Sequence, residues 1–158
     1  MIETSAADLR AALGVERWVT DVASRSPFDT LEDLLATASA AATPLAPVEI
    51  DEAMAHHPRI GEKPVGAGAS QDFSRTEQAS VDADDAETNA LIAEGNAAYE
   101  ERFGRVFLIR AAGRSRAEIL QELRRRLELA VDEELQTVGE QLRDIALLRL
   151  STMYGEKA

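Results

Sequence analysis

The stretch ELQTVGEQLRDIALLRL, residues 134–150, decides the fold class of this chain. Its large apolar residues recur at intervals of three and four positions, which places them on one stripe of an α-helix. They are Leu135, Val138, Leu142, Ile145 and Leu148. Such a stripe must be buried against other elements, so the stretch predicts one helix of an all-α bundle.

Upstream segments also have helical spacing and recognisable ends. We expect a helix over roughly residues 6–23, either continuous or broken at Gly14. Thr30 is expected to cap a helix that stops before residues 43–47, and a short helix is expected over residues 48–55. The apolar face of the Thr30-capped helix would be Leu31, Leu34, Leu35 and Ala38.

In the second half of the chain we expect a long helix from Ser74 to about Phe103, either continuous or interrupted near Gly95. A further helix is expected over residues 115–127. Between them, residues 106–109 read VFLI and fit either a short strand or an extended buried segment. Residues 58–70 read PRIGEKPVGAGAS, a loop that is long for a small protein and therefore typical of a functional or mobile segment.

The composition agrees with one helical domain over residues 1–158. Apolar residues make up 45% of the chain, yet it has only one Trp, two Tyr and four Phe, so Ala, Leu, Val and Ile must build the core. There is no cysteine, which excludes disulfides, thiol nucleophiles and thiolate metal sites. A cysteine-free chain without a visible signal peptide fits the cytoplasm.

The formal net charge of −12 limits the classes of partner. Such a surface repels phosphate backbones and anionic lipid, so we expect neither nucleic acid nor a membrane as a partner. No apolar run is long enough to span a membrane. An anionic substrate would need locally placed arginines, lysines or backbone N–H groups.

The two histidines, His56 and His57, are adjacent, so their side chains diverge and a shared metal ion is not expected. One interpretation leaves both on the surface at a helix end. The other uses Pro58, which stiffens the backbone and holds His57 at a helix-to-loop junction facing a pocket. There a histidine can move a proton near neutral pH.

Ser74-Arg75-Thr76-Glu77 matches a helix capping box, and its spacing alone favours a structural cap. A helix start is also an anion site, and Gln78 adds an amide there, so the two roles are compatible. Ser115-Arg116-Ala117-Glu118 is a second capping box, for which we predict only a cap. The run at residues 124–126, three arginines, predicts a solvated face.

Arg149 lies among leucines in the final helix. It either extends from the apolar face to water or points inward at a carboxylate, and spacing alone favours the first.

The order of these motifs resembles that of the OHCU decarboxylase family over nearly the whole chain. The matching stretches are AHHPRIGE at 55–62, SRTEQ at 74–78, EGNAAYEERFGRVFLIRAAGRS at 94–115, EIL at 118–120 and IALLRL at 145–150, with the RSPF that follows Trp18. The chain departs from the family's pattern at Gly95, where a leucine is frequent, and at Arg105, where a second aromatic is frequent.

The resemblance implies an all-helical, dimeric enzyme that works without metal or cofactor. It implies decarboxylation of 2-oxo-4-hydroxy-4-carboxy-5-ureidoimidazoline, in purine breakdown, to (S)-allantoin. The catalytic residues implied are His57 for proton transfer, with Glu77 and Gln78. The substrate-binding residues implied are Pro58, Ser74, Arg75, Thr76, Glu77, Gln78, Ile109, Arg110, Ala111, Ala112, Gly113 and Arg149.

Two other readings remain open from the sequence. One is a lyase or hydrolase that acts on a related ureide in the same pocket. The other is a helical dimerisation module without enzymatic activity, which an exposed His57 and two purely structural caps would favour.

Overall fold

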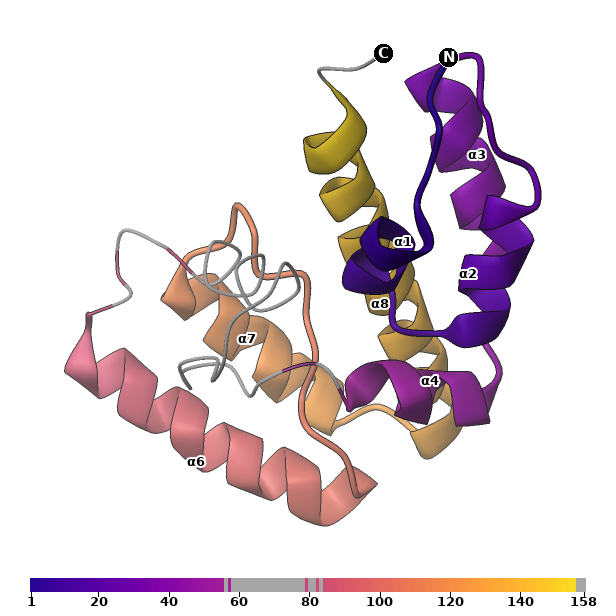
Figure 1. Ribbon diagram of the computed structural model, residues 1–158. Helices are drawn as coiled ribbons and strands as arrows, with labels where there is room; N and C mark the ends of the chain where they lie inside the picture. The colour runs from indigo at the N-terminus through magenta and orange to yellow at the C-terminus, as the bar shows by residue number, and fades with distance from the viewer. Residues whose placement is uncertain (56, 58–78, 80–81, 83, 156–158) are drawn as a thin grey trace. The chain divides into compact units, whose positions relative to one another are not determined.

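A computed structural model of the chain describes residues 1–55, 57, 79, 82 and 84–155, which form seven helices and no strand (Figure 1). The helices are α1 (Ala6–Ala12), α2 (Glu16–Ala23), α3 (Leu31–Ala41), α4 (Pro47–Met54), α6 (Ala86–Phe103), α7 (Arg116–Leu127) and α8 (Val131–Tyr154). The prediction of an all-α fold is confirmed.

The contacts divide the chain into two compact units. The first unit comprises Met1–His56 and Val138–Ala158, and the second unit comprises His57–Thr137. The helix α8 contributes its first turns to the second unit and the rest to the first unit. Each unit has buried apolar residues of its own, and each is described by itself below.

The first unit begins with two short helices where the sequence allowed one long one. The helix α1 ends at Ala12, and Leu13 and Val15 on either side of Gly14 are extended. Leu13 is 1% exposed and Val15 is 0% exposed. The break between α1 and α2 therefore places both side chains in the core of the first unit. The expected alternative of a break at Gly14 is confirmed.

The helix α3 begins where the sequence predicts it. The side chain of Thr30 accepts a hydrogen bond from the Asp33 N–H at 3.1 Å, which satisfies one free amide of the first turn. Leu34 and Ala38 are buried on the expected apolar face. The indole of Trp18 in α2 donates to the Ala38 carbonyl at 3.0 Å, and this bond fastens α2 to α3.

Near the C-terminal end of α8, the buried stripe departs from the predicted residues. Val138, Leu142 and Ile145 are buried as expected, but Leu148 is 39% exposed. After Ile145 and Ala146, the next buried positions are Arg149 and Leu150, so the stripe passes over Leu148 and continues four residues after Ile145. The helix therefore turns an arginine towards the core of the first unit.

In the second unit, α6 begins at Ala86, much later than the expected start at Ser74. Asp85 caps it by accepting from the Thr88 N–H at 3.2 Å, and residues 79, 82, 84 and 85 are not helical. The prediction of a helix from 74 to 103 is therefore wrong over these residues, since acidic side chains compete for backbone amides. The helix continues through Gly95 without interruption.

The helices α6 and α7 pack side by side in the second unit (Figure 1). A Cβ atom placed on Gly95 would lie 2.6 Å from Cδ2 of Leu123. Leu123 is fully buried, so the glycine permits a close approach of the two helices that a leucine at position 95 would block. The departure from the family's pattern at Gly95 thus has a packing reason.

Residues 106–109 form no strand among the described residues and are extended instead. Phe107, Leu108 and Ile109 are 1%, 4% and 3% exposed, so the alternative of an extended buried segment is confirmed. The side chains of Phe107, Ile109 and Ala111 alternate into the core of the second unit.

The run of three arginines at residues 124–126 is only partly a solvated face. Arg124 and Arg125 are exposed, but Arg126 is 0% exposed, so the prediction is wrong for this residue. Arg126 follows the buried Leu123 by three positions and therefore lies on the core-facing stripe of α7. Glu134 of α8 pairs with its guanidinium inside the second unit.

Candidate functional site

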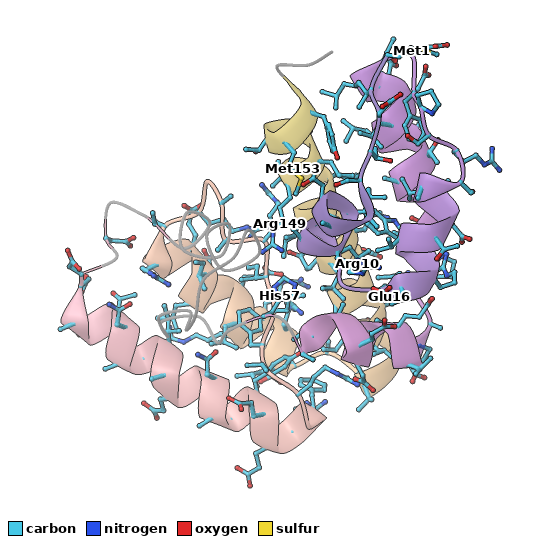
Figure 2. The ribbon with its side chains drawn as sticks, viewed as in Figure 1. Met1, Arg10, Glu16, His57, Arg149 and Met153 are labelled. Atoms are coloured by element: carbon cyan, nitrogen blue, oxygen red, sulfur yellow. The ribbon has the colours of Figure 1, made fainter. Side chains whose placement is uncertain are left out.

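His57 lies at the expected junction between a helix and the chain that follows. The helix α4 ends at Met54 with Ala55 as its cap, and His57 is neither helical nor fully exposed (Figure 2). The residue is half-buried and takes part in an interaction within the structure. Its place after the end of α4 is the helix-to-loop junction that the functional interpretation expects.

Several predicted site residues lie outside the described residues. They are Pro58, Ser74, Arg75, Thr76, Glu77 and Gln78. The loop at 58–70 and the first capping box, which contain them, therefore remain predictions.

The segment Ile109–Gly113 alternates between buried and half-buried residues up to Ala112 and ends in a turn. Ile109 and Ala111 are buried in the core of the second unit, whereas Arg110 and Ala112 are half-buried. The Arg114 N–H donates to the Ala111 carbonyl at 3.0 Å and closes a turn. Gly113 supplies the φ of +80° that this turn needs, a conformation that other residues rarely adopt.

The start of α7, directly after this segment, is satisfied by the protein's own side chains. The Asp82 carboxylate accepts from the N–H groups of Arg116 at 2.7 Å and Ala117 at 3.1 Å. Ser115 and Glu118 complete the predicted capping box through reciprocal bonds of 3.1 and 2.9 Å. The prediction of a purely structural cap is confirmed, and these amides do not serve an anionic ligand.

The sequence on either side of the Ile109–Gly113 segment is basic in an otherwise acidic chain. Five of the chain's 17 basic residues fall between positions 102 and 116. They are Arg102, Arg105, Arg110, Arg114 and Arg116. No acidic residue falls within this range, so the stretch is basic in sequence despite the net charge of −12, as a site for an anionic substrate would require.

Arg149 is buried in the first unit, with 2% of its surface exposed. Its Nη1 donates to the carbonyl of Ala11 in α1 at 2.9 Å, so the side chain joins α8 to α1. The interpretation that it extends to water is wrong, because its stripe position faces the core. Arg149 points inward, as the alternative proposed, and the Ala11 carbonyl is one of its partners.

The predicted site residues divide between the two units. His57 and Ile109–Gly113 belong to the second unit, whereas Arg149 belongs to the first. A surface hollow of about 630 Å³ between α2 and α3 contains none of them. Among the described residues, no group of three or more His, Asp or Glu side chains could hold a metal ion.

Sequence reasoning missed two polar groups near the Ile109–Gly113 segment. One is Asp82, whose role at the start of α7 depends on a contact across 34 residues. The other is the buried set of Tyr99, Arg126 and Glu134. The spacing of Arg126 after Ile119 and Leu123 was a usable signal, because all three share one helical face.

No described helix is both long enough and apolar enough to cross a membrane.

Comparisons with known proteins agree on one family. The sequence profile of the family described as OHCU decarboxylase matches residues 3–151. The chain is 33% identical to the "Uric acid degradation bifunctional protein TTL" of Arabidopsis thaliana over 111 residues, which are 68% of this chain and 34% of that protein. It is 31% identical over 137 residues to the "2-oxo-4-hydroxy-4-carboxy-5-ureidoimidazoline decarboxylase" of Mus musculus, covering 84% of this chain and 75% of that protein.

The fold is similar to a crystal structure of OHCU decarboxylase in the presence of (S)-allantoin. The TM-score is 0.78 at 25% sequence identity, and the match covers 96% of this chain and 99% of that chain. The chain thus spans about a third of the length of the Arabidopsis relative, about three quarters of the mouse relative and nearly all of the crystallised one.

Proposed function

Because the chain belongs to the OHCU decarboxylase family, we propose that it decarboxylates 2-oxo-4-hydroxy-4-carboxy-5-ureidoimidazoline to (S)-allantoin. The predicted family and fold are confirmed, and with the family come decarboxylase activity and a role in urate degradation. The observation that carries the proposal is the family match over residues 3–151. The roles of individual residues are proposed below.

The reaction sets the demands on the protein. The bond between the ring carbon and its carboxylate breaks, CO2 leaves, and the electron pair stays in the ring system until a proton completes the product. A protein that supplies no electron sink of its own must stabilise the developing negative charge with hydrogen-bond donors already in position. Delivery of the proton from one face gives the (S) product.

We assign proton transfer to His57, the histidine that the family resemblance selects. Its half-buried position just after α4 supports the assignment, because a general acid or base must be held within hydrogen-bonding distance of its proton. Glu77 would orient the imidazole and stabilise its charged form, and the Gln78 amide would donate to the substrate. Pro58, Ser74, Arg75 and Thr76 would line the same site.

We assign charge stabilisation to the backbone N–H groups of Ile109–Gly113. Buried side chains at Ile109 and Ala111 hold this segment against the second unit's core, so its backbone is the part that it can present to a ring. The surrounding arginines make the segment locally positive, which favours an anionic substrate. Arg149 would offset the substrate's charge, in addition to its bond with Ala11.

The test generates the unstable substrate from urate with uricase and hydroxyisourate hydrolase, then follows circular dichroism at a band of allantoin. The protein should accelerate the formation of optically active allantoin above the spontaneous rate. No acceleration would contradict the activity. Competition with other ureides separates this substrate from a related one, since the true substrate shows the highest kcat/KM.

A dimerisation module without activity predicts no acceleration and no change of the His57 NMR resonance when allantoin is added. The enzyme predicts that the reaction is accelerated and that the His57 resonance shifts. Dialysis against a metal chelator should leave the rate unchanged, because the proposed donors are protein N–H groups and side chains. A loss of rate that a divalent metal restores would contradict the cofactor-free mechanism.

We further propose that residues 1–158 act as one catalytic domain, that the protein is a homodimer and that it works in the cytoplasm. The family match across both units supports the first point. The absence of cysteine from the sequence is compatible with a reducing compartment. Sedimentation velocity over a range of protein concentrations tests the dimer.

A further inference from the structure

Three polar side chains are completely buried together in the second unit. Tyr99 of α6, Arg126 of α7 and Glu134 of α8 are each 0% exposed. The mechanism proposed above uses none of them. We refer to these three residues as the buried cluster.

The buried cluster is joined by short hydrogen bonds. The Arg126 Nε donates to both Glu134 carboxylate oxygens, at 2.9 and 3.1 Å, and its Nη2 donates to Oε1. The Tyr99 hydroxyl donates to the same Oε1 at 2.6 Å. One carboxylate thus fixes a phenol and a guanidinium from two other helices, and the fork of the guanidinium leaves no rotational freedom.

The remaining arm of the guanidinium holds the backbone next to the proposed site. The Arg126 Nη1 donates to the Leu108 carbonyl at 2.5 Å. The same guanidinium lies 4.7 Å from the centre of the Phe107 ring, and the Tyr99 ring meets Phe107 edge-on at 5.3 Å. Both residues directly before Ile109 are therefore fixed by the buried cluster.

This support matters because residues 106–109 have no neighbouring strand among the described residues. A strand within a sheet takes its position from the ladder of hydrogen bonds on either side. Here a charged side-chain donor bonds the backbone directly before Ile109–Gly113. Desolvation offsets much of the attraction within a buried ion pair, so the effect of this pair is better sought in the geometry that it imposes.

We infer that the buried cluster is a positioning device for the Ile109–Gly113 backbone and that Arg126 is the positioning residue. The inference rests on the proposed function, in which this backbone stabilises the transition state. Displacement of such donors by about 1 Å can lower a rate by about a hundredfold. The cluster would therefore control kcat without touching the substrate.

Arg126→Lys is the first variant. Lysine keeps the positive charge but has one ammonium group in place of the planar guanidinium, so it can bond either Glu134 or the Leu108 carbonyl but not both. We expect kcat to fall by about tenfold to a hundredfold with a smaller change in KM, because the donors act mainly on the transition state. Ile92→Val is the matched control, since it trims the same core and changes none of the cluster's hydrogen bonds.

A second variant separates positioning from folding. Tyr99→Phe/Arg126→Met/Glu134→Leu replaces the whole cluster by apolar groups and leaves no unpaired buried charge, an exchange that proteins often tolerate. We expect this protein to fold, to lack the bond to the Leu108 carbonyl and to have a kcat at least as low as that of Arg126→Lys. A folded variant with the kcat of the wild type overturns the inference.

Amide hydrogen exchange gives a readout that does not depend on activity. The amides of Ile109–Gly113 should exchange faster in Arg126→Lys, at equal global stability, and should be unchanged in Ile92→Val. Unchanged exchange in a folded Arg126→Lys protein overturns the inference. If the wild type does not decarboxylate the substrate, the proposed function fails, and the exchange experiment still decides whether the cluster orders this segment.

Discussion

The guanidinium of Arg149 in the last helix donates a 2.9 Å hydrogen bond to the carbonyl of Ala11 in the last turn of the first helix. The last carbonyls of a helix have no partner within it, and a positive charge is favourable at that end. A residue that the family resemblance assigns to the substrate therefore also joins two helices that are 138 residues apart in sequence.

Arg149→Met should lower the free energy of unfolding by about 2 kcal/mol, because a buried hydrogen bond to a charged group is lost. Urea denaturation followed by circular dichroism measures this change. Addition of (S)-allantoin should raise the unfolding midpoint of the wild type more than that of the variant. If the variant has the stability of the wild type but its unfolding midpoint does not rise with (S)-allantoin, Arg149 serves the substrate alone.

His57→Asn should lower kcat by about a hundredfold to ten-thousandfold, the usual contribution of general acid–base catalysis, with the fold intact. The coupled circular dichroism assay measures the rate. The neighbouring histidine gives a matched control, since His56→Asn changes the same chemical group one position away and should retain activity. Full activity in His57→Asn would remove the catalytic assignment without affecting family membership.

Stability should decrease at high pH through the chain's two tyrosines. Burial and the Asp8 carboxylate, which accepts the phenol's hydrogen bond at 2.7 Å, raise the pKa of Tyr154 to about 12. Burial and the bond to Glu134 also raise the pKa of Tyr99 above its ordinary value. The folded state holds both protons more tightly than the unfolded chain, whose tyrosines ionise near pH 10.

The contribution of both tyrosines is therefore complete below about pH 10 and is lost as the pH rises towards the folded-state pKa values. Urea denaturation across this range measures the loss, and it should be smaller in Tyr154→Phe. Ultraviolet absorbance should show little tyrosinate in the native protein at pH 10. Ordinary ionisation of both groups at that pH would contradict the two buried hydrogen bonds.

Gly95→Ala should destabilise the protein by about 1 kcal/mol. The new Cβ atom would meet Leu123 at 2.6 Å, and overpacking of this kind costs about 1–3 kcal/mol, whereas alanine regains about 1 kcal/mol of helix propensity. Thermal unfolding measures the difference. In a Leu123→Ala background the clash is absent, so there Gly95→Ala should stabilise the protein instead.

The sequence predicted helices best where local signals define both ends or one face. Thr30 and Ser115 cap helices as expected, because a short polar side chain close to the free amides needs no distant partner. The start of the long helix was placed too early, because Asp82 and Asp85 use their carboxylates on backbone amides, and residues 79, 82, 84 and 85 lie outside the helix.

By itself, the sequence determined the all-α class, the family and the identity of the proposed site residues. Periodicity, helix caps and the order of motifs depend on residues that are close in the sequence, so they can be recognised without a structure. Only the tertiary structure decided which charged side chains enter the interior. Arg126 can be buried because the Glu134 carboxylate accepts its hydrogen bonds, and Arg149 can be buried because the Ala11 carbonyl does. In each case the acceptor belongs to another helix, so it comes within reach only when the helices have packed.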